Sequence, residues 1–372
     1  MIPKIIVLGG SYLQVSFIQR AEKLGYHVLV LDGNAACYCA RFGIGEFHHL
    51  DFAKKEVLRN FYNKVGAISI FAPVNEFGNV IASDLAQELG YNYNRSEVVK
   101  ASGDKKLFWE KLVGLELAKP RSYNEKDLSK DSLPVIIKPT ISTSSKGVSL
   151  VTEEQEINEA IMYARQSGKN QEIRIEEYIG GFQYSLETLT VNGRHFIIGV
   201  IEEHLSEAPY FFERSDIFNL QEQEEKKEFF IDFVKLILDR FGVEVGPCHI
   251  EVKVLEGKIY LIDFATRSGG WRDMMLMLAG IDYNKLIVEA YIKNSVKEIS
   301  EVKALKSVGA AILNYHEDLL ALKRAQKMGL VKEVHFNGQV PKLSPRGLND
   351  AFGYYFITAD TKEDLVGLLP TY

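Results

Sequence analysis

The residues best placed to do chemistry are two carboxylates on neighbouring short strands. The sequence predicts strands at residues 247–254 and 260–264, joined by a turn at 256–258. Glu251 lies on the polar face of the first strand, and Asp263 is the one acid in the apolar second strand. Burying two carboxylates is costly unless a hard cation such as Mg²⁺ neutralises them. The pair therefore predicts a Mg²⁺ site, with a hairpin carrying surface acids as the alternative.

A lysine and a hydroxyl-rich loop precede these strands. Lys138 ends an apolar strand, and the loop at residues 140–148 is rich in Ser and Thr and contains Lys146 and Gly147. Small residues let successive backbone N–H groups converge on phosphate oxygens, and Lys146 adds positive charge. Lys105, at the start of an earlier predicted helix, could reach the same phosphates. A flexible loop and surface lysines are the alternatives.

The end of the predicted strand at residues 173–179 is suited to a purine base. Backbone groups at a strand end can pair with the ring nitrogens and amine of adenine, and Ile179 would supply apolar cover. After a glycine pair, Gln183 lies within reach of a ribose. Two solvated glutamates, Glu176 and Glu177, are the alternative interpretation of the same segment.

The elements around these residues predict an α/β domain followed by an α+β domain. Up to about Glu97, strands alternate with amphipathic helices, which is typical of a parallel sheet covered on both faces. Strands are expected at 4–8, 27–32 and 67–72, and helices at 15–24, 54–62 and 78–89. The turn Gly9-Gly10-Ser11 lacks the GxGxxG spacing, so nicotinamide binding is not favoured. The crevice at the strand ends can still hold part of a substrate.

Residues 98–300 are expected to form two lobes of mixed helices and strands, and residues 301–372 a small C-terminal subdomain. The expected helices are 104–115, 153–166, 222–241 and 318–328. The further strands are 135–138, 148–151, 184–191, 195–202, 308–313 and 354–358. Residues 205–220 are expected to form a loop, and the tail before the last strand is turn-rich, with Gly338, Pro341, Pro345 and Gly347.

Composition narrows the class of protein. The 372 residues are 46% hydrophobic and 25% charged, with a net charge of −6, which argues against nucleic acid as the main partner. No apolar run approaches the length of a membrane span, and the N-terminus lacks the layout of a signal peptide. Cys37, Cys39 and Cys248 form no disulfide framework, so we expect a cytoplasmic protein with buried thiols.

The order of these features resembles the ATP-grasp superfamily. The series runs Lys105, Lys138, the loop to Gly147, Glu176 to Ile179, Glu251, Asp263 and Arg267. The domain at residues 1–97 resembles the N-terminal domain of carboxylate–amine ligases and biotin-carboxylase-like enzymes. The stretch 246–251 is most similar to that of L-amino acid ligases. The similarity covers nearly the whole chain and is least specific after residue 300.

The resemblance implies a role for each matching residue. The phosphates of ATP would be bound by Lys105, Lys138, Ser145, Lys146 and Gly147. Adenine and ribose would be held by Glu176, Glu177, Tyr178, Ile179 and Gln183. Glu251 and Asp263 would bind Mg²⁺, for which Mn²⁺ can substitute, and Arg267 would stabilise an acyl phosphate together with Lys138.

Three positions depart from the family pattern. The usual ribose carboxylate is replaced by Gln183, and the second metal carboxylate is Asp263 where Glu is common. Ala265 stands where the family often has an asparagine as a third metal ligand. These differences bear on the number of bound Mg²⁺ ions and leave the Glu251/Asp263 pair in place.

The activity that the resemblance implies is an ADP-forming ligase. A small carboxylate would be phosphorylated by ATP, and an amine, such as an amino acid, would then form an amide. The substrates are expected between residues 267–272 and a loop around Glu202 and Glu203, with His204, Gly269 and Arg272 in contact and Trp271 either in contact or only packing. The alternatives are a bicarbonate-activating carboxylase-like enzyme and a non-catalytic ATP-binding module, the latter supported by Ala265. Whether the chain forms a homodimer is left open.

Overall fold

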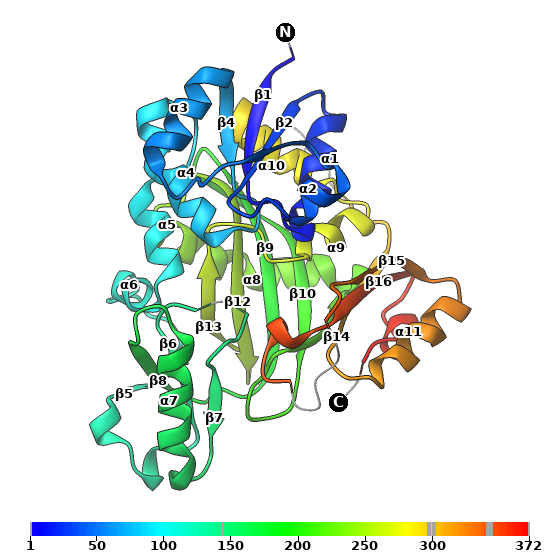
Figure 1. The fold of residues 1–372 in the computed structure, drawn as a ribbon. Helices are drawn as coiled ribbons and strands as arrows, with labels where there is room; N and C mark the ends of the chain where they lie inside the picture. Colours follow the sequence, from blue (N-terminus) through cyan, green and yellow to red (C-terminus); the bar gives the residue numbers. More distant parts are fainter. Residues whose placement is uncertain (1, 143, 296–298, 300–302, 340–344, 371–372) are drawn as a thin grey trace.

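The computed structural model describes residues 2–142, 144–295, 299, 303–339 and 345–370. Thr143 of the hydroxyl-rich loop, Pro341 of the tail and the expected domain boundary at 300–301 lie outside the described residues. The chain folds around three sheets (Figure 1). No helix in the described part of the chain has the length and apolar character needed to cross a bilayer.

The N-terminal sheet is parallel, as the sequence predicted. Its strand order is β3-β2-β1-β4, and its strands are β1 (Lys4–Leu8), β2 (His27–Asp32), β3 (Glu46–His49) and β4 (Ala67–Phe71). Its helices are α1 (Val15–Lys23), α2 (Tyr38–Phe42), α3 (Lys55–Val65) and α4 (Glu76–Leu89). A helix from much later in the chain, α10 (Tyr283–Lys293), packs against α1 and β4 and joins the same hydrophobic core (Figure 1).

A small antiparallel sheet forms a separate lobe. Its order is β5-β8-β6-β7, with β5 (Ser122–Tyr123), β6 (Val135–Pro139), β7 (Ser149–Val151) and β8 (Ile173–Glu177). Helix α7 (Ile157–Ser167) covers one face, where Ala160 and Ala164 pack with Val135 and Ile175. This core contains few large side chains, so the lobe is held by a thin layer of apolar contacts.

The large sheet is antiparallel, with the order β13-β12-β9-β10-β11-β14-β16-β15. The strands are β9 (Phe182–Val191), β10 (Arg194–Leu205), β11 (Glu213–Phe218), β12 (Val245–Leu255), β13 (Lys258–Ala265), β14 (Ser307–Leu313), β15 (Val331–Phe336) and β16 (Gly353–Ala359). The remaining helices are α5 (Ser96–Gly103), α6 (Lys105–Lys111), α8 (Gln223–Phe241), α9 (Arg272–Leu278), α11 (Asp318–Lys327) and α12 (Glu363–Val366). The α/β and α+β fold class is thereby confirmed, while the domain boundaries stay a prediction.

The expectations for the local structure of residues 205–220 and 104–115 were wrong. Residues 205–220 contain the strand β11, which lies inside the large sheet. All six of its residues are buried, and its polar members are paired with charges from distant segments, so no alternating pattern marks it as a strand. The expected helix at 104–115 is shorter, because α6 ends at Lys111, and α5 precedes it.

Candidate active site

One cavity of about 590 Å³ lies where the three sheets meet. It collects side chains from the small sheet, from β12 and β13 of the large sheet, and from the loops at the carboxyl ends of the parallel N-terminal strands. Its charged lining residues are Asp32, Glu76, Lys105, Lys138, Lys146, Lys169, Glu176, Glu177, Glu213, His249, Glu251, Lys253, Asp263, Arg267 and Arg272. A concave site that gathers charged groups of both signs in this way suits a charged small molecule.

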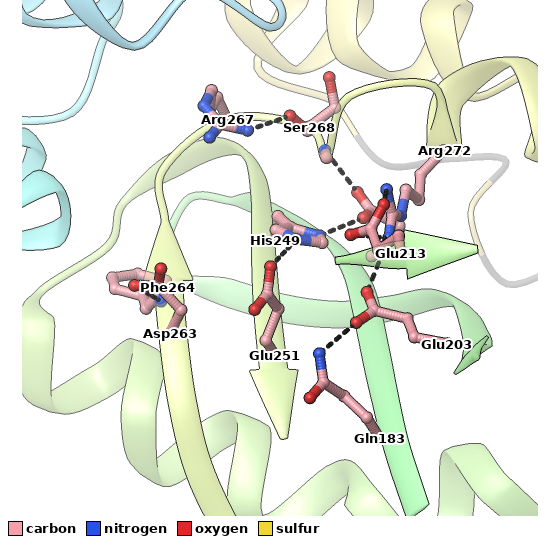
Figure 2. A network of polar contacts seen from close by, with 12 residues as sticks. Gln183, Glu203, Glu213, His249, Glu251, Asp263, Phe264, Arg267, Ser268 and Arg272 are labelled. Carbon is pink, nitrogen blue, oxygen red and sulfur yellow. Dashed lines mark hydrogen bonds and ion pairs between the residues drawn. The ribbon is translucent and has the colours of Figure 1, made fainter. Parts of the chain in front are cut away.

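The two carboxylates of the hairpin face this cavity from adjacent strands. Glu251 and Asp263 are paired in the register of β12 and β13, while Ile250 and Val252 point into the core behind β12. Asp263 accepts a 2.8 Å hydrogen bond from the Lys105 ammonium, and Glu251 lies 3.1 Å from the ring of His249 (Figure 2). The carboxylates are therefore side by side but have different partners.

Two of the three predicted phosphate lysines, Lys105 and Lys138, form ion pairs inside the cavity. Lys138 Nζ lies 2.6 Å from Glu176, which also pairs with Arg174. Burial alone would raise the pKa of Glu176, but Lys138 and Arg174 hold it below the usual value. Burial likewise opposes the charge on Lys105, yet Asp263 raises the pKa of that lysine. Lys105 thus keeps its charge inside the cavity, as a phosphate site requires, and Lys138 is paired with an ionised glutamate.

The hydroxyl-rich loop borders the cavity with its backbone in an unusual conformation. Ser144 and Ser145 have φ angles of 59° and 54°, and both line the cavity with Lys146. Gly147 does not line it: its φ is 84°, and an added Cβ would lie 2.8 Å from Pro139 Cγ. Gly147 therefore lets the loop fold back against Pro139, and direct phosphate contact is not its evident role.

The expected adenine end is built on stacked rings. Tyr178 stacks on Phe211 at 5.6 Å, and Lys253 lies over Tyr178 while donating a 2.9 Å hydrogen bond to the carbonyl oxygen of Ile179. Burial lowers the pKa of Lys253 to about 8. Phe211 and Lys253 were not singled out from the sequence. The only available signals were an aromatic loop and a polar residue on the Glu251 face of β12.

Arg267 is held by the N-terminal domain. Its Nε donates a 2.7 Å hydrogen bond to Glu76, the first residue of α4, and its Nη1 donates to the Ser268 carbonyl oxygen at 2.9 Å (Figure 2). Glu76, Asn75 and Asp32 follow β4 and β2 and line the same region. The crevice at the parallel strand ends therefore opens into the cavity beside Arg267.

The structure changes the expectation for Arg272. Its guanidinium is 3% exposed and lies 2.7 Å from Glu203, 2.9 Å from Glu213 and 3.4 Å from Asp216. Burial raises the pKa values of Glu203 and Asp216 to about 7, against the opposing effect of Arg272. Because the guanidinium is shared among three internal carboxylates, it is poorly placed to hold a substrate carboxylate as well.

His204 was wrongly placed by the sequence analysis. Residues 202–204 belong to strand β10 and not to a loop, and alternate residues of a strand face opposite sides. Glu203 points to Arg272, whereas Glu202 on the other face pairs with Lys226 and Lys362. His204 shares that outer face and does not line the cavity.

A buried histidine–carboxylate pair escaped the sequence analysis. His249 Nδ1 lies 2.6 Å from Glu187 on β9, and the Gly269 N–H donates to the other oxygen of Glu187 at 3.2 Å. Burial would lower the pKa of His249, but Glu187 and then Glu251 raise it to about 10. A Cβ at Gly269 would come within 2.3 Å of His249 Nδ1, so this glycine makes room for the pair.

Comparison with known families points to the same region of the chain. Residues 131–275 match the family described as "ATP-grasp domain". The large chain of carbamoyl phosphate synthase from Thermoanaerobacter sp. is 23% identical over 328 residues. The match covers 80% of this chain, which spans only about 30% of the length of that relative.

Solved structures share the fold over nearly the whole chain. The L-amino acid ligase from Bacillus licheniformis superposes with a TM-score of 0.80 at 19% identity, covering 97% of this chain and 94% of the ligase. The ADP complex of N5-carboxyaminoimidazole ribonucleotide synthetase gives a TM-score of 0.77 at 16% identity, covering 99% of this chain and 96% of the synthetase. At such identities the likeness establishes the arrangement of elements.

Proposed function

We propose that this chain is an ATP-dependent carboxylate–amine ligase, because residues 131–275 match the ATP-grasp domain family that the sequence resemblance indicated. A carboxylate oxygen of the first substrate attacks the γ-phosphorus of ATP, and ADP leaves. The amine nitrogen of the second substrate then attacks the carbonyl carbon of the acyl phosphate. Phosphate leaves, the nitrogen loses a proton, and an amide is formed.

One observation carries this proposal: segments far apart in the chain bring three lysines suited to phosphates and two carboxylates suited to a metal ion into one cavity. Lys105, Lys138 and Lys146 supply positive charge, and Glu251 and Asp263 supply hard oxygen ligands. Lys105 and Lys138 are each held by an acid, at 2.8 and 2.6 Å, and the phosphates of a nucleotide can replace those acids as partners. The stacked pair Tyr178–Phe211 then covers the side where a base would lie.

The donor set fits Mg²⁺, because Glu251 and Asp263 are adjacent carboxylates that face the cavity. When bound with ATP, Mg²⁺ would neutralise the phosphate oxygens during transfer. For Asp263 to coordinate the ion, Lys105 must turn from Asp263 toward a phosphate, which its four-carbon side chain allows.

Arg267 and the strand ends of the N-terminal domain form the acceptor side. We infer that the Arg267 guanidinium, fixed by Glu76, holds the negative charge of the acyl phosphate. Lys138 on the opposite lobe then neutralises the transferred phosphoryl group. Arg272 has a different task from the one expected, since it organises Glu203, Glu213 and Asp216 at the inner end of the cavity.

The size of the cavity favours an organic acceptor over bicarbonate. Its lining continues past Arg267 to Gly9, Ser11 and Gln14 of the first strand-end loop and to Trp271. A bicarbonate ion would leave most of that region filled with water, which weakens the exclusion of water that acyl phosphate chemistry needs. A carboxylic acid with a side chain would fill it.

The test is ADP release measured in three parallel reactions with ATP and Mg²⁺. One contains pooled amino acids, one bicarbonate, and one neither. We expect ADP and an amide product only with amino acids, and mass spectrometry of the products identifies the pair joined. ADP release that depends on bicarbonate, or no release under any condition while ATP still binds, would overturn the proposal.

A further inference from the structure

A second set of metal-ligating atoms lies beside the Glu251/Asp263 pair. One ligand atom from each of Glu203, His249 and Glu251 lies within 4.8 Å of the other two, and two of the three residues are buried. Figure 2 shows His249 and Glu251 on β12, where they are two residues apart, and Glu203 on β10 of the same sheet. Asp263 is not part of this set, since it pairs with Lys105.

The way His249 is held is an independent sign of a ligating imidazole. Histidines that bind metals commonly donate the other ring N–H to a carboxylate, which fixes the tautomer and the ring orientation. Here Glu187, which is fully buried, holds Nδ1 at 2.6 Å and is itself fixed by the Gly269 N–H at 3.2 Å. The ring is thereby turned so that Nε2 points to Glu251 at 3.1 Å.

The space around His249 supports the same interpretation. In the β12–β13 register His249 is paired with Ala265. Because alanine has no polar side-chain atom, the imidazole is the polar group of that pair.

We propose that Glu203, His249 and Glu251 bind a divalent transition-metal ion, with Glu187 as the residue that positions His249. Glu251 is shared with the Mg²⁺ site proposed above, Glu203 supplies an oxygen ligand, and the metal ion replaces the proton on Nε2 of His249, which then supplies a nitrogen ligand. Mg²⁺ prefers oxygen ligands alone, whereas imidazole suits Mn²⁺, Co²⁺ and Zn²⁺. The site should therefore select such an ion even when Mg²⁺ is in excess.

The experiment uses Mn²⁺ as the probe and pulsed electron paramagnetic resonance as the readout. The full chain is loaded with Mn²⁺ in excess Mg²⁺ without ATP, and modulation from a directly coordinated nitrogen is recorded. We expect this signal in the wild type and its loss in His249→Gln. Asp263→Asn is the matched control, because it alters the neighbouring carboxylate and should keep the signal.

Glu187→Gln tests the positioning residue. It keeps the shape of the side chain but weakens its hold on the imidazole, so Mn²⁺ affinity in a binding titration should fall about 10- to 100-fold. Circular dichroism and thermal unfolding establish that each variant is folded. An unchanged affinity in folded Glu187→Gln would overturn its role.

The measurement on the wild-type chain can overturn the proposed site without any variant. If the wild type shows no nitrogen modulation at saturating Mn²⁺, the proposed site is overturned. If the modulation persists in folded His249→Gln, the coordinating nitrogen belongs to another residue, and the proposed site is likewise overturned. Since the readout needs no ATP, it is separate from the ligase proposal. Nitrogen coordination without any ADP release would overturn the ligase alone, and ADP release without nitrogen coordination would overturn this site alone.

Discussion

The two ends of the cavity hold their charges in different ways. At the nucleotide end, Lys138 pairs with Glu176 and Lys105 with Asp263, so each lysine has one close acid as its partner. At the inner end, the guanidinium of Arg272 is shared among Glu203, Glu213 and Asp216, deep between β10, β11 and α9.

Because of this difference, the lysines at the nucleotide end can exchange their carboxylate partners for phosphates, whereas Arg272 at the inner end is fixed. A lysine ammonium on a flexible stem can leave a carboxylate for a phosphate with little change in the surrounding packing. A planar guanidinium bound to several buried acids is fixed by all of them, and removing it leaves uncompensated charge. We therefore expect ATP binding to depend on the nucleotide end and global stability to depend on the inner end.

The largest effect should follow from removing either metal carboxylate. Glu251→Gln or Asp263→Asn should abolish turnover, because each change removes one of the two carboxylates that are proposed to hold Mg²⁺. A Mg²⁺ titration of ADP release in the wild type and both variants measures this. If both variants keep wild-type turnover and metal dependence, the site is elsewhere.

Replacing Arg272 should cost the most stability. Arg272→Met leaves three buried acids without their guanidinium, and breaking such a buried pair typically costs about 3–5 kcal/mol. Lys138→Met is the matched comparison at the nucleotide end, where Arg174 remains to hold Glu176. Denaturant unfolding gives both free energies. Equal losses would contradict the distinction drawn between the two ends.

Nucleotide affinity should depend on Lys138. Charge-assisted contacts in a partly dry cleft contribute about 1.5–3 kcal/mol each, so Lys138→Ala should weaken ATP binding about tenfold or more. Lys106→Ala is the control, because that lysine is exposed and does not line the cavity. Calorimetric titration that finds unchanged ATP binding in folded Lys138→Ala would remove this residue from the site.

The acid next to Arg272 should make stability depend on pH. Asp273 is buried against Ser16 and Asn284, and burial raises its pKa from 3.8 to about 6. Between these values the folded protein keeps a proton that the unfolded chain releases, so this group's contribution to stability falls as pH rises from 4 to 6 and is constant above.

Asp273→Asn should remove this component of the pH dependence. The free energy of unfolding of the wild type minus that of the variant should fall by roughly 1–3 kcal/mol as the pH rises from about 4 to 6. Urea unfolding at pH 4, 5, 6 and 7 measures the difference. A difference that stays constant across these pH values would show that Asp273 ionises as it does in the unfolded chain.

The smallest effect concerns the hydroxyl-rich loop. Ser144 and Ser145 offer no apolar anchor, so we expect their ordering to depend on contacts with phosphates. Hydrogen exchange of residues 144–148 should slow when ATP is added, while exchange in β12 stays the same. Equal protection of the loop with and without ATP would count against its role as a lid.

Local sequence pattern was enough to find the nucleotide end. The alternation along β12, the apolar strand before Lys138 and the small residues after it are all set by neighbours in the chain. Strand periodicity fixes which side chains share a face, and a strand end fixes where a loop begins. These patterns singled out Lys138, Glu251 and Asp263, and the order of the motifs along the chain, through its resemblance to the ATP-grasp superfamily, assigned them to one predicted site.

Only the tertiary structure decided the inner end. The partners of Arg272 lie 56 to 69 residues earlier, on strands whose register, including a shift next to His204, determines which side chains face inward. Nothing in the local sequence around Glu203 or Asp216 indicates that these side chains face inward, because a register shift of one residue exchanges the two faces of a strand. The same holds for Glu187, which meets His249 through the pairing of β9 with β12. The sequence by itself thus determined the chemistry at the strand ends, and long-range strand pairing decided which buried charges surround it.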